Sequence, residues 1–254
     1  MLGGTSWAWA GVISLEVQPR PTIRDDTLEV SVDITNQGDE PAYAVKVSVE
    51  VQDAVWMSPA REALEAQAHH TVDYQRPIKG LGRGSYPLIV RVFYTDAQGY
   101  PFSALAVSQV TVGEDIAPAV WAVLENGQLR TQGQLSLRVK NLEDRRQTVI
   151  VRPVLPQELT TQPSRLTRTL EPSQDTRMTF RLKNFSARGE STYPVYAVIE
   201  ENRHDAHLTT VSAATVHIVS GPPLQPYQTT FLILGGVLLL MVVLLNVRGS
   251  RSTT

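Results

Sequence analysis

The chain has 254 residues and a mass of 28.0 kDa; 42% of its residues are hydrophobic and 19% are charged. It contains no cysteine, which excludes a disulfide scaffold, a thiolate metal site and a cysteine nucleophile. The formal net charge is −2, and neither half of the chain is basic enough to indicate a nucleic-acid partner. At roughly 100–150 residues per domain, this length predicts two domains or a single large one.

The first segment, 1–14, has some features of an export signal. Ala8-Trp9-Ala10 has the small residues of a cleavage site, but the basic start and the full apolar run of a signal peptide are missing. Either the start is truncated or the signal is weak. If this segment is the remnant of a signal, the mature chain begins near Gly11.

The next hundred residues have the pattern of antiparallel strands. Apolar and polar residues alternate over 28–35 and again over 45–52, the period of a half-buried strand. Between these stretches, 36–41 predicts a turn, with Gly38 available for positive φ and Pro41 ending the pairing. Helical patterning is almost absent, apart from one or two turns at 59–67. Two further strands are expected at 86–94 and 104–112.

The second half repeats this layout. Tyr193 matches Tyr86 at an offset of 107 residues, and Asn141 matches Asn36 at an offset of 105. The repeat predicts an all-β fold of two tandem immunoglobulin-like β-sandwiches plus one C-terminal transmembrane helix. The joint near 113–118 is short enough to limit motion between the sandwiches. The expected boundaries are 15–113 and 114–220, and the further strands expected in the second module are 134–140, 177–183 and 214–219.

The segment 229–247 contains no charged residue and predicts a transmembrane helix. At about 1.5 Å per residue it would span nearly 30 Å, the thickness of a bilayer core. A buried core helix is the alternative, but such a helix would be amphipathic, whereas this segment is apolar all round. The residues assigned to this anchor are Tyr227 at the interface, Phe231, Gly235 and Gly236 in the span, and Arg248 and Arg251 beyond it.

The charges beside this helix predict its orientation. The Pro-rich linker 221–228 carries no charge, whereas Arg248 and Arg251 follow the helix at once. The positive-inside rule therefore places the tail 248–254 in the cytoplasm and the body outside, in the periplasm or at the cell surface. The alternative is a tail-anchored protein with a cytoplasmic body. The linker, with three prolines, should be a stiff spacer.

The stretch 28–51, with its two alternating strands and its Asn-Gln-Gly-Asp-Glu-Pro turn, resembles the start of CARDB modules. It is also similar to the immunoglobulin-like module that accompanies bacterial alpha-galactosidases. The resemblance covers most of 15–113 and, more weakly, 118–220, where the turn at Asn141 lacks the glycine and a changed hairpin is expected. It implies an adhesion, spacer or docking module of the bacterial or archaeal envelope, with no catalytic residues.

Several titratable residues are candidates for a metal site or a catalytic site. His204 and His207, with His69 and His70, could hold a metal, but the position of His204–His207 predicts a solvated turn. Three acidic pairs are interpreted as charged loop tips rather than glycosidase acids: Asp25-Asp26, Glu143-Asp144 and Glu200-Glu201. A calcium site at Asn36, Asp39 and Glu40 is weighed against a simple turn, and the turn is favoured.

Two tryptophans are the candidates for an interaction surface, Trp56 and Trp121, although core packing is the alternative for each. We therefore expect a non-enzymatic, single-pass protein of the cell membrane with no cofactor. Its partners would be other membrane or envelope proteins of a multi-subunit complex and the lipid bilayer. The alternative is a polysaccharide-binding or surface-adhesion module, so a glycan partner stays open.

Overall fold

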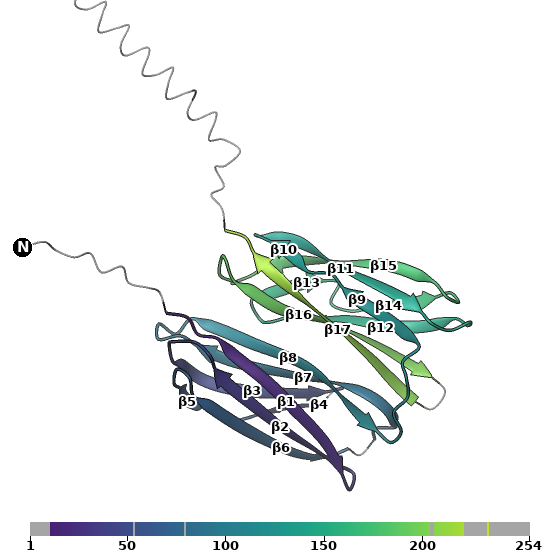
Figure 1. Cartoon of the computed structure of the whole chain (residues 1–254), viewed down its shortest axis with the longest axis horizontal. Helices are drawn as coiled ribbons and strands as arrows, with labels where there is room; N and C mark the ends of the chain where they lie inside the picture. The colour runs from purple at the N-terminus through teal and green to yellow at the C-terminus, as the bar shows by residue number, and fades with distance from the viewer. Residues whose placement is uncertain (1–10, 53, 79, 204–205, 221–232, 234–254) are drawn as a thin grey trace, which may run out of the picture. The chain divides into compact units, whose positions relative to one another are not determined.

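The computed structural model describes residues 11–52, 54–78, 80–203, 206–220 and 233. Residues up to Ile218 form one compact unit, and its described part is all-β (Figure 1). Among the described residues, no helix is both long and apolar enough to cross a bilayer. The segment expected to do so, 229–247, lies outside the described residues except for Ile233. The same is true of Tyr227, Phe231, Gly235, Gly236, Arg248, Arg251 and the first ten residues.

Eight strands make up the first module. They form a three-stranded sheet, β1-β2-β6, and the first part of a larger sheet in which β7 lies between β3 and β8 and in which β4 and β5 both pair with β3. Their bounds are β1 Leu15–Arg24, β2 Thr27–Asn36, β3 Ala42–Val51, β4 Ala54–Met57, β5 Arg61–Leu64, β6 His69–Pro77, β7 Arg83–Thr95 and β8 Pro101–Val112.

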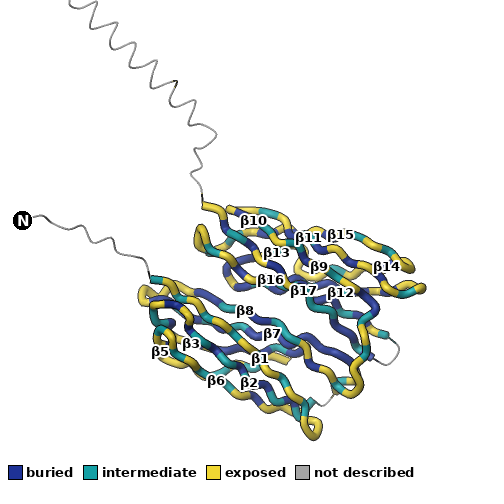
Figure 2. The backbone as a smooth tube through the Cα atoms, in the orientation of Figure 1, coloured by how far each residue is buried: buried dark blue, intermediate teal, exposed yellow. Residues whose placement is uncertain are grey.

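The first core lies between these two sheets. Along β2, buried and partly buried residues alternate, as the period of two predicted (Figure 2). Val32 and Ile34 are fully buried in this core. The expected strands at 28–35, 45–52, 86–94 and 104–112 are confirmed within a few residues. The helical turns considered at 59–67 are wrong, because Arg61–Leu64 pairs with β3 as strand β5.

Nine strands make up the second module. A four-stranded sheet, β13-β15-β11-β9, covers a core that contains Leu135, Leu137 and Phe180, and the opposite layer is β14-β12-β16-β17 with β10 beside β17. Their bounds are β9 Val120–Leu124, β10 Gly127–Leu129, β11 Gln132–Asn141, β12 Gln147–Val154, β13 Leu159–Gln162, β14 Leu166–Leu170, β15 Asp175–Asn184, β16 Thr192–Arg203 and β17 Ala206–Ile218.

A short parallel pairing joins the larger sheets of the two modules into one ten-stranded sheet. Ala206 pairs with Arg83 and His207 with Gly84. Gly84 has a φ of +127°, and a Cβ at this position would lie 1.8 Å from the carbonyl oxygen of His207. Only glycine allows this backbone conformation and this close approach. The domain boundaries expected from the sequence stay a prediction.

The matched asparagines form equivalent hydrogen bonds in the two modules. Asn36 and Asn141 are fully buried, and each donates its side-chain amide to the carbonyl four residues later and accepts a bond from the backbone N–H two residues later. The second turn is therefore not a changed hairpin. The positive φ expected at Gly38 is also wrong. A Cβ at this position would lie 2.0 Å from the carbonyl oxygen of Val12, so glycine is needed because the segment before β1 packs directly against it.

Candidate functional site

The outward faces of the two larger sheets contact each other. Along β7 and β8 the outward side chains include Ile89 and Leu105, and along β12 and β16 they include Val154 and Val198. These four are each no more than 5% exposed and form a third apolar cluster. This face of the first module is consequently used inside the molecule, and it is not available to a partner.

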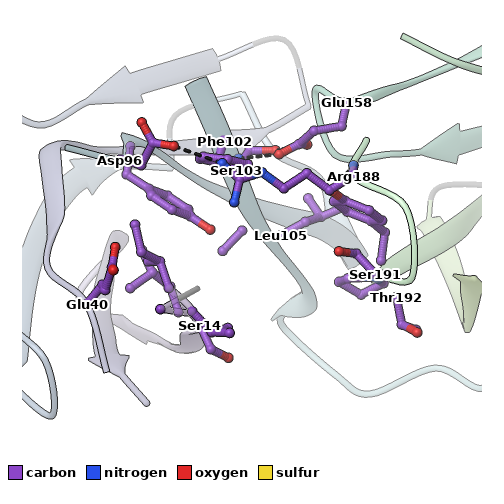
Figure 3. Close-up of a pocket in the computed structure, with 18 of the residues that line it drawn as sticks. Ser14, Glu40, Asp96, Phe102, Ser103, Leu105, Glu158, Arg188, Ser191 and Thr192 are labelled. Carbon is purple, nitrogen blue, oxygen red and sulfur yellow. Dashed lines mark hydrogen bonds and ion pairs between the residues drawn. The ribbon is translucent and has the colours of Figure 1, made fainter. Parts of the chain in front are cut away.

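A buried carboxylate crosses this contact. Glu158, which follows β12, is fully buried; its carboxylate accepts the backbone N–H of Ser103 at 2.7 Å and the hydroxyl of Ser103 at 2.8 Å (Figure 3). Burial raises the pKa of Glu158, and the hydrogen bonds from Ser103 oppose this effect only in part. The serine hydroxyl also accepts the N–H of Gln157 at 2.9 Å. The polar atoms of this pair are thus satisfied by the two modules together.

A loop of the second module holds a hairpin of the first. Arg188 donates to the nearly buried Asp96 at 2.8 Å, and its guanidinium lies 4.5 Å from the ring centroid of Phe102. Asp96 also accepts two backbone N–H groups of its own hairpin, from Gln98 and Tyr100. Both carboxylate oxygens of Asp96 therefore accept hydrogen bonds, and the side chain links the two modules.

Glu158 and Asp96 both line a groove of about 770 Å³. The residues labelled in Figure 3 come from both modules, and three of them, Glu40, Asp96 and Glu158, are acidic. Tyr94 is one wall of the groove; burial raises the pKa of its phenol, so it stays neutral at neutral pH. The Ser103 hydroxyl and the Glu158 carboxylate in this groove are both buried and hydrogen-bonded across the two modules, and we assign them a structural role.

Further polar contacts complete the joint. Thr209 donates two hydrogen bonds to Ser85, from its backbone N–H to the serine hydroxyl at 2.9 Å and from its own hydroxyl to the serine carbonyl at 2.8 Å. Glu50 accepts from Arg91 of its own module at 3.0 Å and from Arg152 of the other at 2.5 Å. An apolar centre ringed by satisfied polar groups is typical of a specific protein interface.

The sequence interpretation of His207 as part of a solvated turn is wrong. It lies in β17 and stacks on the ring of Tyr86 at 4.7 Å, and its Nε2 lies 3.3 Å from a carboxylate oxygen of Glu200. Glu200 and Glu201 are not loop tips, because both lie within β16, and the carboxylate of Glu201 is buried where it accepts the N–H of Ala119. His204 lies outside the described residues.

The residues weighed as metal ligands have other roles or lie apart. Asn36 uses its amide on the carbonyls of Glu40, Leu64 and Glu65, and Asp39 accepts the N–H of Val12. Within the part of the chain that the structure describes, no group of three or more histidine or acidic side chains could hold a metal ion. The histidines at 69 and 70 lie on β6, on the opposite sheet from the joint.

Trp56 lies beside an apolar groove at the outer edge of the first module. It is partly buried against the first core and lines a groove of about 370 Å³ with Leu28, Val51, Ile78 and Leu81 among others. Its strand, β4, is the last strand of the ten-stranded sheet, and the neighbours of Trp56, Val55 and Met57, are 59% and 58% exposed. These two residues were not singled out from the sequence.

Trp121 lies elsewhere, on the outward face of β9 in the second module. It is 43% exposed, and the guanidinium of Arg138 lies 5.9 Å from its ring centroid. The two candidate tryptophans therefore belong to different sheets and do not form one row of rings.

Comparisons with known proteins identify a family for part of the chain. A search of curated proteins finds no match. Among solved structures, the chain is similar to alpha-2-macroglobulin of Escherichia coli (14% identity, TM-score 0.32, 81% of this chain and 17% of that one) and to red sea bream transglutaminase (10%, 0.28, 80% and 31%). It is also similar to a protein of unknown function from Porphyromonas gingivalis W83 (14%, 0.28, 80% and 99%).

The chain spans less than a third of the first two proteins, and similarity at this level defines no function for it. The family match is of a different kind. The model of the CARDB family matches residues 12–97, from the segment before β1 to the end of β7. The resemblance expected for 118–220 stays a prediction. Residues 12–97 therefore match the CARDB family of bacterial immunoglobulin-like β-sandwich modules.

Proposed function

We propose that this protein is a non-catalytic accessory subunit that docks on other membrane or envelope proteins. In this proposal a single C-terminal helix, 229–247, anchors it in the cell membrane, with its body in the periplasm or at the cell surface and its tail, 248–254, in the cytoplasm. Support comes from the uncharged segment and the arginines that follow it. The CARDB domain adds support, because it is a family without catalytic residues.

The observation that carries the docking proposal is the edge strand β4. Its sequence, Ala-Val-Trp-Met, has no charged side chain, whereas soluble proteins usually protect an exposed edge with charges or proline. The edge strands β5 and β6 of the same module do carry charges. An unprotected apolar edge beside an apolar groove is the kind of surface to which an extended segment of a partner adds as a further strand.

The register of β4 leaves backbone groups free for such a strand. Ser58 donates its N–H to Val47 of β3, and hydrogen-bonded positions alternate along an antiparallel pair. The backbone N–H and carbonyl of Trp56 therefore face β3, and those of Val55 and Met57 face away from it. The partner would pair with these two residues, and one of its apolar side chains would enter the groove beside Trp56.

The joint between the modules favours a scaffold role. Because the two modules are held together by the contacts described above, a partner bound at β4 would be fixed relative to the whole body. The membrane helix and the proline-containing linker would raise the effective concentration of this body near membrane-embedded partners.

The docking proposal is tested by photocrosslinking from position 55 in intact membranes. We expect a discrete protein adduct, and we expect the variant Val55→Pro to lose co-purification of that protein after mild detergent extraction, because proline removes an outward N–H. The control is Val55→Thr, which keeps the outward N–H and a β-branched side chain at the same position. A protein that is monomeric in every detergent and gives no adduct would refute the docking role.

The orientation is tested separately with sealed spheroplasts. Protease added from outside should digest the body and leave the short tail protected. An intact body, under conditions that cleave a known external control protein, would contradict the proposed topology.

A second function, polysaccharide binding, is favoured by one observation. Trp121 exposes its ring beside Arg138, an arrangement that suits stacking on a sugar face. Glycan-array binding by the full chain in detergent, lost in Trp121→Ala, would support it. An array without signal would remove it.

A further inference from the structure

One corner of the second module combines exposed cations with an exposed aromatic ring. Phe185, just after β15, is 76% exposed, more than any other large apolar side chain among the described residues. Arg181 and Lys183 precede it on the outward face of β15, and Arg130 lies beside it across a small cavity of about 350 Å³. We call Arg130, Arg181, Lys183 and Phe185 the basic corner.

The cations of the basic corner have no acidic partner among the described residues. Elsewhere on the same sheet, Arg138 pairs with Asp175 at 2.7 Å and Arg177 with Glu125 at 2.5 Å. Arg181 and Lys183 form no such pair, and Arg130 contributes only its backbone carbonyl, which accepts from Asn184. Since residues two apart on a strand point to the same side about 6.7 Å apart, the two cations of β15 lie side by side, uncompensated.

The basic corner lies at the end of the module where the chain leaves the compact unit. The loop that begins with Phe185 also contains Glu190 and Ser191, and these exchange backbone hydrogen bonds with Ile218, the last residue of β17. Ten residues separate Ile218 from the predicted membrane segment, which limits the reach of this end to about 35 Å.

We propose that the basic corner rests on the membrane surface, with Phe185 in the interfacial layer and the three cations on anionic phospholipid headgroups. This inference rests on the proposed membrane anchorage. Aromatic rings and basic side chains are the residues favoured where a protein meets the headgroup layer. A basic residue close to an anionic surface strengthens such a contact about fivefold. The contact would make a second attachment for a body already held by its helix.

The experiment uses the full chain reconstituted in vesicles with and without anionic phospholipid. Because the native chain has no cysteine, a fluorophore can be placed at Thr131→Cys, directly beside the basic corner, or at Asp144→Cys, in the turn at the opposite end of β11. We expect lipids carrying a quencher to reduce the signal at position 131 and not at position 144, and we expect the effect to require anionic lipid.

Matched variants test whether the lipid contact depends on the basic corner itself and not on the overall charge or hydrophobicity of the protein. The double variant Arg181→Glu with Lys183→Glu should lower the fraction of protein whose fluorophore at position 131 is quenched more than tenfold. Adding Phe185→Ser should lower this fraction further. The control, Lys140→Glu with Leu142→Ser, removes a cation and an exposed apolar side chain at the opposite end and should change nothing.

Two kinds of failure are distinguishable. If the protein does not float with the vesicles, the membrane anchor itself is refuted. If it floats but position 131 is quenched no more than position 144, the basic corner does not contact lipid and this inference is overturned. Equal quenching with and without anionic lipid overturns the assignment to anionic headgroups, and a protein crosslinked from position 185 in native membranes assigns the corner to a protein partner instead.

Discussion

In each module, one buried asparagine at the end of a strand holds the following turn in place. Asn36 donates its amide to three carbonyls, those of Glu40, Leu64 and Glu65, and Asn141 donates to two. We predict that Asn36→Ala and Asn141→Ala each lower the free energy of unfolding by about 2–4 kcal/mol, because buried carbonyls lose their donor. Thermal and denaturant unfolding of the purified chain would measure this. Gln18→Ala, at an exposed position of β1, is the control, and an equal effect there would contradict the argument.

Glu158 predicts a pH dependence with a definite sign. Its pKa is raised in the folded protein, so the stability it contributes is complete at low pH and is lost as the pH rises through the folded pKa. Glu158→Gln keeps an acceptor for the N–H of Ser103 and has no charge to bury. We therefore expect this variant to gain stability relative to the native chain as the pH rises from about 4 to about 8. Unfolding midpoints across that range would test this, and a constant difference would refute it.

At the scale of elements, local patterns predicted the strands but not their contacts across the joint. The alternation in β2 and β15 is visible in the sequence because one face meets a core and the other meets water. Val198 and Leu105 are apolar residues on the faces of their strands that point away from the module cores. The sequence around such a residue does not indicate whether it contacts another module or solvent. Glu158 was missed and His207 was misread for the same reason. The partner of Glu158 across the joint lies 55 residues away in the chain, and those of His207 lie 121 and 123 residues away.

The pairing of β7 with β17 depends on one glycine. We predict that Gly84→Ala disrupts it, because an added Cβ meets the carbonyl oxygen of His207 in addition to the strain of positive φ. The control is Gly99→Ala, which has a φ of +78° but open space around the Cβ. Spin labels on the two modules should report a broader distance distribution for Gly84→Ala only. If the two variants behave alike, backbone strain and not contact between strands is the dominant effect.

At the scale of the whole molecule, the joint predicts that the two modules unfold together. Its apolar centre and its bonds, among them Ser103–Glu158 and Arg188–Asp96, are made only when both modules are folded, so each stabilises the other. A scanning calorimeter should therefore record one transition for the native chain. Leu105→Ala with Val198→Ala removes apolar contacts at the joint, and we expect it to split this transition into two. Val32→Ala, inside the first core, should lower the temperature of the single transition without splitting it. Two transitions in the native chain would mean that the modules fold independently, and the joint could not then hold a partner docked at β4 in a fixed position relative to the second module.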